Sequence, residues 1–292
     1  MGVFMLGAII GDIAGSFREF SKDKFSNLDL FPSKSEIPEY LRARYGITDD
    51  SVLTIATWLA LQEENVSEDE FRYRYYHYGR CFEQVGYGLG FSKWLRSDYN
   101  LALPYNSCGN GSAMRVSPVG WFAKDIDRCY ELARMSASVT HNHPEGIKGA
   151  AFVALMIYLY RNGETNPEKI IKEKFGIKYQ RCAGYDHFDK ICQETIPLAL
   201  FVLDSSSNFH DAVKMAVTIP FADSDTLGAI VGSIAEAKYE GVPVDLAKKA
   251  LNLIINQAKP EIKRILKTNY SSNFIDLIPD LNESETLESI WN

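Results

Sequence analysis

Apolar residues recur every three or four positions along most of the chain, which is the spacing of one face of an α-helix. The pattern predicts helices over residues 5–16, 52–59, 68–96, 144–160, 191–204, 208–219 and 227–239, and a closing helix pair over 247–266. Strand-like alternation of any length, low-complexity linkers and periodic repeats are absent from the sequence. We therefore predict an all-α fold in which residues 1–292 form one domain.

The segments between these helices read differently. Residues 21–45 contain Pro32 and Pro38 and are predicted to form loops with one short helix. Residues 97–118 read as an ordered loop that enters a helix, and the polar residues 161–190 are predicted to be looped. The acidic end, residues 275–292, is predicted to be a loose tail or a last short helix.

The predicted helix at 5–16 carries Gly7, Gly11 and Gly15 on one face. A glycine inside a helix costs about 1 kcal/mol relative to alanine, so three on one face need a packing reason. The smooth face that they form admits another backbone closely. We expect this helix to be central and tightly packed.

Two predicted helices begin with clustered carboxylates and hydroxyls. The first cluster is Thr48, Asp49, Asp50 and Ser51, and the second is Asp223, Ser224, Asp225 and Thr226. Either cluster alone is equally well explained by helix capping, because Asp, Ser and Thr are preferred caps and first-turn carboxylates are stabilised by the helix macrodipole. A cap needs only one such residue, however, and clustered oxygens suit Mg²⁺. If the two helix starts meet in space, four carboxylates would hold about two divalent ions.

Two further segments place polar groups at helix starts. Gly109–Gly111 precedes a predicted helix, where consecutive backbone amides can bind phosphate oxygens, although Asn-Gly is equally an ordinary turn signal. Pro144 suits the first turn of the helix at 144–160. For His141 and His143 we favour a hydrogen-bonding or capping role over metal ligation, because no cysteine lies nearby.

Arginines and tyrosines interleave along Phe71–Arg80. Such a stretch could stack on nucleobases, but an amphipathic helix whose arginines snorkel is the favoured interpretation. Elsewhere in the sequence there is no comparable basic stretch that would extend a nucleic-acid groove. The net charge of -7 also argues against broad binding to nucleic acid or to anionic membranes.

Composition indicates the class of protein and the cellular compartment. With 46% hydrophobic residues among 292, the chain can bury a substantial core. Its five cysteines are widely spaced and form no CxxC pair, as in a reduced cytosolic protein. The first residues lack the basic region of a signal peptide, and the longest apolar run, 150–160, is shorter than the ~20 residues that span a bilayer. We expect a soluble, cytoplasmic protein.

Five sequence blocks, taken in order, resemble the ADP-ribosylglycohydrolase family of DraG-like and ADP-ribosylhydrolase proteins. The blocks are Gly7–Asp12 with Glu19, Thr48–Ser51, Gly109–Arg115, Thr140–Glu145 and Asp223–Thr226. A single block is weak evidence, but the ordered set across residues 7–226 is highly specific. The resemblance implies a compact orthogonal helix bundle and a Mg²⁺-dependent hydrolase. Such an enzyme would cleave the glycosidic bond between ADP-ribose and a modified protein side chain or small molecule, with two Mg²⁺ ions in a cleft and Mn²⁺ as the alternative ion.

The resemblance also implies roles for individual residues. The metal ligands would be Thr48, Asp49, Asp50, Asp223, Asp225 and Thr226. The ADP-ribose site would be lined by Ser107, Gly109, Asn110 and Gly111, with His141 reaching the phosphates or a ribose. Glu19 would be the carboxylate beside the scissile bond, as general base or as the group that holds the attacking water. ADP-ribosyl-arginine is the favoured substrate on resemblance alone, while serine, small-molecule and nucleic-acid acceptors stay open.

The sequence departs from the family pattern at two positions, and two other interpretations of it are open. Many members have an aromatic residue where this chain has Cys108, so Tyr105 is the substitute for stacking on adenine, and Ser51 replaces a common threonine. Asp223–Thr226 also resembles the two-aspartate nucleophile motif of haloacid-dehalogenase-type phosphatases. That motif follows a buried strand, whereas Ile219–Ala222 is short and contains proline. The other alternative is a non-catalytic member that binds ADP-ribose or has an immunity or structural role.

Overall fold

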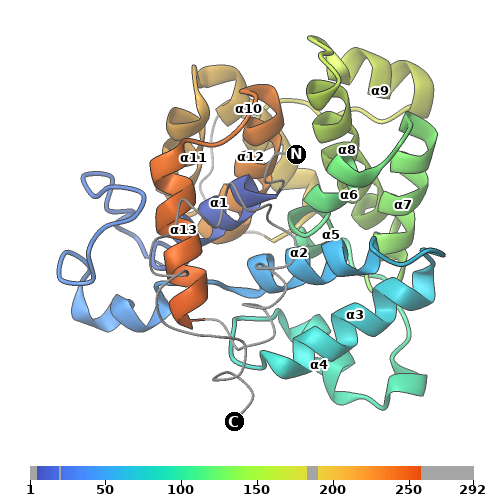
Figure 1. The fold of residues 1–292 in the computed structure, drawn as a ribbon, viewed down its shortest axis with the longest axis horizontal. Coiled ribbons are helices and arrows are strands. Elements are labelled where there is room, and N and C mark those ends of the chain that lie inside the picture. Colours follow the sequence, from blue (N-terminus) through green and yellow to red (C-terminus); the bar gives the residue numbers. More distant parts are fainter. Residues whose placement is uncertain (1–4, 20, 183–189, 258–292) are drawn as a thin grey trace, which may run out of the picture.

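The computed structural model describes residues 5–19, 21–182 and 190–257. In these ranges the chain is built from helices (Figure 1). They are α1 Leu6–Ser16, α2 Asp49–Ala60, α3 Glu68–Cys81, α4 Leu89–Arg96, α5 Gly111–Met114, α6 Ser117–Phe122, α7 Ile126–Ser138, α8 Pro144–Arg161, α9 Pro167–Phe175, α10 Cys192–Ser205, α11 Phe209–Thr218, α12 Ser224–Lys238 and α13 Val244–Gln257, with short 3₁₀ helices at Glu39–Arg44 and Tyr99–Leu101. The described ranges contain no strand, only an isolated bridge between Gly109 and Ile191. The all-α prediction is confirmed.

Helices α1 and α12 pack backbone to backbone at the centre of the structure. Every residue of α1 is buried. A Cβ added to a glycine of α1 would overlap a carbonyl group of α12, in the pairs Gly7 with Gly232, Gly11 with Gly228 and Gly15 with Ser224. These pairs run in opposite directions along the two helices, so the end of α1 lies beside the start of α12. The expectation of a tightly packed central helix is confirmed.

The other end of this helix pair is closed by a buried carboxylate. Glu236, in the last turn of α12, accepts a hydrogen bond of 2.9 Å from the backbone N–H of Gly7. No side chain within α1 caps its first turn, where Met5 has a φ of 77°. Glu236 therefore satisfies the start of α1 from another helix, since the first N–H groups of a helix have no partner inside it.

Most predicted helices lie where the pattern places them. The 68–96 stretch is divided into α3 and α4, and the short helix expected within 21–45 is the one at Glu39–Arg44. The prediction that 161–190 is looped is wrong for Pro167–Phe175, which forms α9 between a first-turn proline and Gly176 at a φ of 69°. Helices α6 and α7 lie outside the predicted set. The second half of 247–266 and the tail at 275–292 lie outside the described residues.

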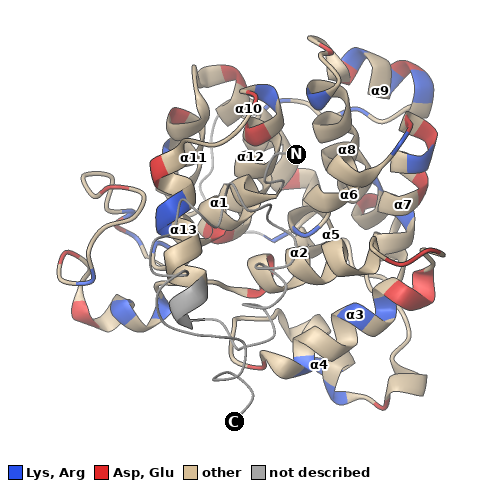
Figure 2. Cartoon of the chain, in the orientation of Figure 1, with Lys and Arg blue, Asp and Glu red and all other residues tan. Residues whose placement is uncertain are grey.

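Charged residues gather on the outer helices. Figure 2 shows blue and red along α3, α7 and α9, whereas α5 and α6 carry neither colour. On α3, Arg74 pairs with Glu70 at 2.5 Å and Arg72 lies over the ring of Tyr99 at 4.6 Å, as the amphipathic interpretation predicts. None of the helices within the described ranges is long and apolar enough to cross a membrane.

Candidate active site

The helix starts that carry the acidic clusters open into one cavity. Its walls come from the segment after α1, the starts of α2 and α12, residues 86–91, the loop before α5 together with α5, the loop after α7, and Lys190 before α10. The predicted site residues that line it are Glu19, Asp49, Asp50, Asp223, Asp225, Thr226, Ser107, Gly109, Asn110, Gly111 and His141. Thr48 is the one predicted site residue outside that lining.

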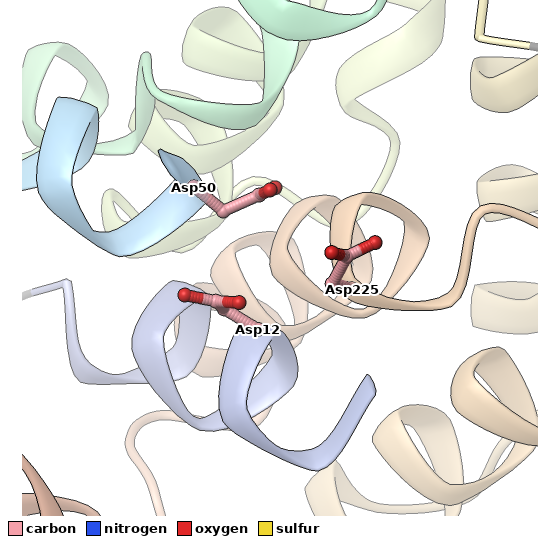
Figure 3. Close-up of side chains that lie close together, drawn as sticks. All are labelled: Asp12, Asp50 and Asp225. Carbon is pink, nitrogen blue, oxygen red and sulfur yellow. The ribbon is translucent and has the colours of Figure 1, made fainter. Parts of the chain in front are cut away.

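Three carboxylates from three helices converge at the site. Asp12 of α1, Asp50 of α2 and Asp225 of α12 each offer an oxygen within 4.8 Å of the others. Figure 3 shows these side chains pointing toward one another across the space between the helices. Each is at most 4% exposed, so the three charges are held away from water.

Asp12 organises the start of α2. Its Oδ2 accepts hydrogen bonds of 3.0 Å from the backbone N–H groups of Thr48 and Ser51, and the Ser51 hydroxyl donates to the same oxygen. Burial raises the pKa of Asp12 to about 6, although the hydrogen bonds from Ser51 and Thr48 favour the charged form. A single carboxylate of α1 therefore fixes the turn that presents Asp49 and Asp50.

Thr48 caps α2 and faces the same carboxylates. Its hydroxyl accepts from the Asp50 N–H at 3.2 Å and lies 2.7 Å from Asp12 Oδ1, to which it donates. A hydroxyl oxygen has two lone pairs, so one is left for a cation. The capping and ligation readings of this residue are therefore compatible.

A second group of carboxylates shares Asp225 with the first. Glu19, Asp223 and Asp225 also each offer an oxygen within 4.8 Å of the others, so Asp225 belongs to both groups. Lys190 Nζ bonds Glu19 at 2.7 Å and lies 3.5 Å from Asp223. Burial, followed by the charge of Asp223, raises the pKa of Glu19 to about 7, while Lys190 opposes the shift.

The two groups fit hard divalent cations. Their donors are carboxylate oxygens with hydroxyls beside them, which is the donor set that Mg²⁺ prefers. Oδ1 of Asp50 is buried without a hydrogen-bond donor among the described residues, and Oδ1 of Asp223 has only the 3.5 Å ion pair with Lys190. A buried carboxylate oxygen that lacks a donor is unfavourable unless a cation meets it.

The pKa shifts of these carboxyl groups also favour cation binding. Burial, with Asp12 as the next cause, raises the pKa of Asp49 to about 8 and holds that of Asp50 well above its usual range. Burial and then the charge of Glu19 do the same for Asp225. Bound cations of charge two would offset this accumulation of negative charge.

The glycines of the predicted phosphate loop serve the packing of His141. A Cβ on Gly111 would lie 3.1 Å from His141 Nε2, tighter than most real contacts, and one on Gly109 would lie 3.4 Å from it, near ordinary contact. Neither glycine has a positive φ. The amides of Gly109 and Asn110 donate to Ser107 Oγ and to the Lys190 carbonyl, which favours the turn over the phosphate-binding alternative for these two amides.

Asn110 reaches into the acidic cluster. Its side-chain amide donates to Asp223 at 2.9 Å and to Thr195 at 3.1 Å. It therefore orients a predicted metal ligand, in addition to lining the cavity as expected.

His141 is a buried, neutral hydrogen-bonding group. Burial, with Arg115 as a second cause, holds its pKa well below the usual range. Thr140 Oγ1 accepts from Arg115 at 2.8 Å and lies 2.8 Å from His141 Nδ1. We assign the ring proton to Nε2, because the threonine hydroxyl then donates to Nδ1. Nearby, His143 Nδ1 accepts from the Glu145 N–H and caps α8, as predicted.

Three residues complete the site beyond the predicted set. Asp12 is the one carboxylate in an otherwise apolar helix. A charged residue in such a position is the sequence feature that could have identified it. Lys190 follows a segment without any motif and gives no sequence signal. Tyr105, considered above for stacking, lines the cavity with its ring centroid 5.8 Å from that of His141.

Comparisons with known proteins identify chains that are similar to this one. A family model described as ADP-ribosylglycohydrolase matches residues 3–272. The chain is 25% identical over 287 residues to ADP-ribosylarginine hydrolase Tri1 of Pseudomonas putida (strain GB-1), a match that covers 84% of this chain and 72% of Tri1. It is 28% identical over 194 residues to ADP-ribosylhydrolase ARH3 of Homo sapiens, covering 59% of this chain and only 53% of that relative.

A solved structure shares the fold. The structure titled "ADP-ribosylglycohydrolase-related protein complex" superposes with a TM-score of 0.62 over 85% of this chain and 94% of that chain. At 19% sequence identity, this likeness concerns the helical architecture alone.

Proposed function

The chain belongs to the ADP-ribosylglycohydrolase family, and from that premise we propose that it is a Mg²⁺-dependent hydrolase that releases ADP-ribose from a modified arginine side chain. The family reaction is hydrolysis of the glycosidic bond of ADP-ribose. Two features are this proposal's own: the metal dependence and the arginine acceptor, which follows the printed name of the Tri1 relative.

One observation carries the proposal. Two acidic helix starts, a separate glutamate and the Gly109–Gly111 wall all line a single cavity, although they lie up to about two hundred residues apart in the sequence. A fold without a ligand at this position would have no reason to bury several carboxylates together, because each repels the others.

The ions would lie between the starts of α2 and α12. Thr48, Asp49 and Asp50 would hold them from one side and Asp223, Asp225 and Thr226 from the other, with Asp225 common to both carboxylate groups. When bound, the two cations would hold ribose hydroxyls and lower the pKa of an attacking water. Asp12 and Asn110 would orient the ligands through the hydrogen bonds described above.

Glu19 would act on the water that attacks the ribose C1. Its carboxylate is 14% exposed at the cavity, beside the second acidic group. Burial, the main cause, raises its pKa toward neutral pH, and a general base works best when its pKa is close to the working pH. Either it takes a proton from the water or it holds the water in line with the scissile bond.

The remaining residues would bind the ADP-ribose half. His141 would donate from Nε2 to a phosphate or ribose oxygen, and the Ser107 side chain lies in the same wall. Tyr105 would stack on the adenine, because its aromatic ring lines the cavity beside His141.

The experiment is hydrolysis of defined substrates. The protein is incubated with ADP-ribosyl-arginine and ADP-ribosyl-serine peptides in Mg²⁺ or in EDTA, and released ADP-ribose is measured. We expect Mg²⁺-dependent release from the arginine peptide. Glu19→Gln should slow it about 100-fold or more, the usual effect of losing a general base. Glu39→Gln, at an exposed glutamate of the same part of the chain, should leave the rate unchanged.

Each other outcome has a defined meaning. Release from the serine peptide alone would keep the hydrolase and replace the acceptor. Tight binding of ADP-ribose without release from either peptide would make the protein a binding module. Failure both to bind and to hydrolyse would overturn the proposal.

A further inference from the structure

Lys24 is a buried lysine whose ammonium group meets three neutral oxygens. The residue is 5% exposed. Its Nζ donates to the backbone carbonyls of Arg18 and Ala222, each at 3.0 Å, and to Ser224 Oγ at 2.8 Å. An ammonium group has three donors, so these bonds satisfy it completely.

The three acceptors lie next to the residues of the candidate active site. Arg18 directly precedes Glu19, and Ala222 and Ser224 stand on either side of Asp223. One ammonium group therefore joins the segment that carries Glu19 to the turn that begins α12, across 198 and 200 residues of sequence.

The backbone of Lys24 is itself held in place by Arg18. The buried Arg18 side chain donates to the Lys24 carbonyl at 3.1 Å and to the Asp29 carbonyl at 2.8 Å, and it also bonds the Ala14 carbonyl of α1. Arg18 and Lys24 thus donate to each other's backbone carbonyls. Through its hydrogen bonds to Ala222 and Ser224, Lys24 links Arg18 to the start of α12.

A buried ammonium group is an unusual choice for such a link. Burying a lysine is unfavourable unless its donors are satisfied and negative charge is near. The attractive charges that act on Lys24 are those of Asp225, Asp223 and Glu19. The same cation must oppose the binding of further cations at these carboxylates, so retention of metal cannot be its purpose. What it does stabilise is the position of the Glu19 segment.

We propose that Lys24 is a positioning residue for the reaction, which holds the Glu19 segment against the Asp223 turn and so places the Glu19 carboxylate at the bound sugar. The kinetic consequence rests on the proposed function. The structural consequence, a pinned 18–24 segment, does not depend on it.

The kinetic test replaces Lys24 by methionine, which keeps the apolar stem and removes the donors. We expect kcat on the ADP-ribosylated peptide to fall about 100-fold, the size of effect that a small misplacement of a catalytic group produces. The dissociation constant for ADP-ribose, measured by calorimetry, should not change, and Mg²⁺ should bind more tightly because a neighbouring cation is gone. Lys22→Met, at an exposed lysine of the same segment, should match the wild type throughout.

Two further measurements separate positioning from general loss of structure. In a Glu19→Gln background, Lys24→Met should cost nothing more in kcat, because it acts through Glu19. Hydrogen exchange should speed up at the described amides of residues 18–25 and stay unchanged within α12, a readout that holds even if no substrate of the wild type is found. Should the methionine variant fail to fold, Lys24→Gln takes its place with the same expectations.

The proposal is overturned by any of three results. They are a folded Lys24 variant with wild-type kcat, an additive loss in the Glu19→Gln background, and exchange at 18–25 identical to that of the wild type. Weaker binding of both Mg²⁺ and ADP-ribose together would also reject it, since that is the signature of a merely structural lysine.

Discussion

Asp225 is a buried carboxylate that is surrounded by other carboxylates of the site. It belongs to both carboxylate groups, is 4% exposed, and is repelled by Glu19, Asp223, Asp50 and Asp12. Without a cation this carboxylate works against the folded state, whereas with cations it is the ligand that both would share. Its contribution to stability should therefore change sign with the metal.

Replacement of Asp225 by asparagine tests that change of sign. In EDTA the variant should be at least as stable as the wild type, because the amide carries no charge for the neighbouring carboxylates to repel. In Mg²⁺ the wild type should gain stability and the variant should not, because the shared ligand is lost. Thermal unfolding in both buffers measures this.

The matched control for that variant is Asp69→Asn, whose carboxylate is 86% exposed on α3. It should follow the wild type in both buffers. Equal Mg²⁺ stabilisation of the Asp225 variant and the wild type would remove Asp225 from the metal site.

At the scale of elements, the antiparallel pair of α1 and α12 decides where the site lies. Matched glycines let the two backbones touch along the whole of α1, so the end of α1 is brought to the start of α12. Asp12 and Glu19 are thereby placed beside Asp225 and Asp223. The start of α2 joins them because it is bound to Asp12.

Gly11→Ala should break this contact. Its Cβ would overlap the Gly228 carbonyl, which belongs to a buried backbone and cannot move aside. We expect the free energy of unfolding to fall by about 3 kcal/mol or more, the upper range for overpacking a core. Chemical denaturation measures it, and Gly88→Ala, where a Cβ would meet nothing within 4 Å, should change it by less than about 1 kcal/mol. Equal losses in the two variants would contradict the packing argument.

Glu236, at the far end of the helix pair, gives a pH dependence. Burial raises its pKa from 4.5 to about 8, against the hydrogen bonds from the first amides of α1 that favour its charged form. The folded state then binds more protons than the unfolded state, so this contribution to stability is complete below about pH 4.5 and is lost as the pH rises through about 8. The acidic cluster adds a slope of the same sign in the absence of metal.

Glu236→Gln isolates the contribution of that one carboxyl group. The amide keeps an oxygen acceptor for the Gly7 N–H and does not ionise. In EDTA, we expect the free energy of unfolding of the wild type to fall relative to that of the variant between pH 5 and pH 8, by about 1 kcal/mol or more. Two parallel curves would show that Glu236 ionises alike in the folded and unfolded states.

For the molecule as a whole, the site ties together segments from most of the described chain. Cations bound between α2 and α12 would therefore stabilise the central helices more than the outer ones. Hydrogen exchange in Mg²⁺ and in EDTA tests this: we expect slower exchange in α1, α2 and α12 with Mg²⁺, and no change in α9 at the periphery. Uniform protection of every helix, or none at all, would place the ions elsewhere.

The haloacid-dehalogenase alternative fails on this architecture. The residues before Asp223 follow helix α11, and no strand precedes the motif in the described chain. The nucleophile motif of those phosphatases needs a buried strand to present it. Asp223–Thr226 therefore resembles that motif in residue types but not in structure.

The sequence by itself determined most of the helices and the capped starts of α2 and α8, because periodicity and capping are local properties of neighbouring residues. It also determined which oxygen-rich clusters were available for chemistry. Its local signals failed at α9, where a polar composition outweighed the proline and glycine that mark the two ends of the helix.

Only the tertiary structure decided which groups meet. Asp12, Lys24, Lys190 and Glu236 each stand alone in the sequence, and each acquires its partner from a segment that is 36 to 229 residues away. Charges interact through space rather than along the chain, so their pairing depends on how closely α1 and α12 approach. The glycines on both helices permit that approach, which brings the carboxylates of α1 and α12 together.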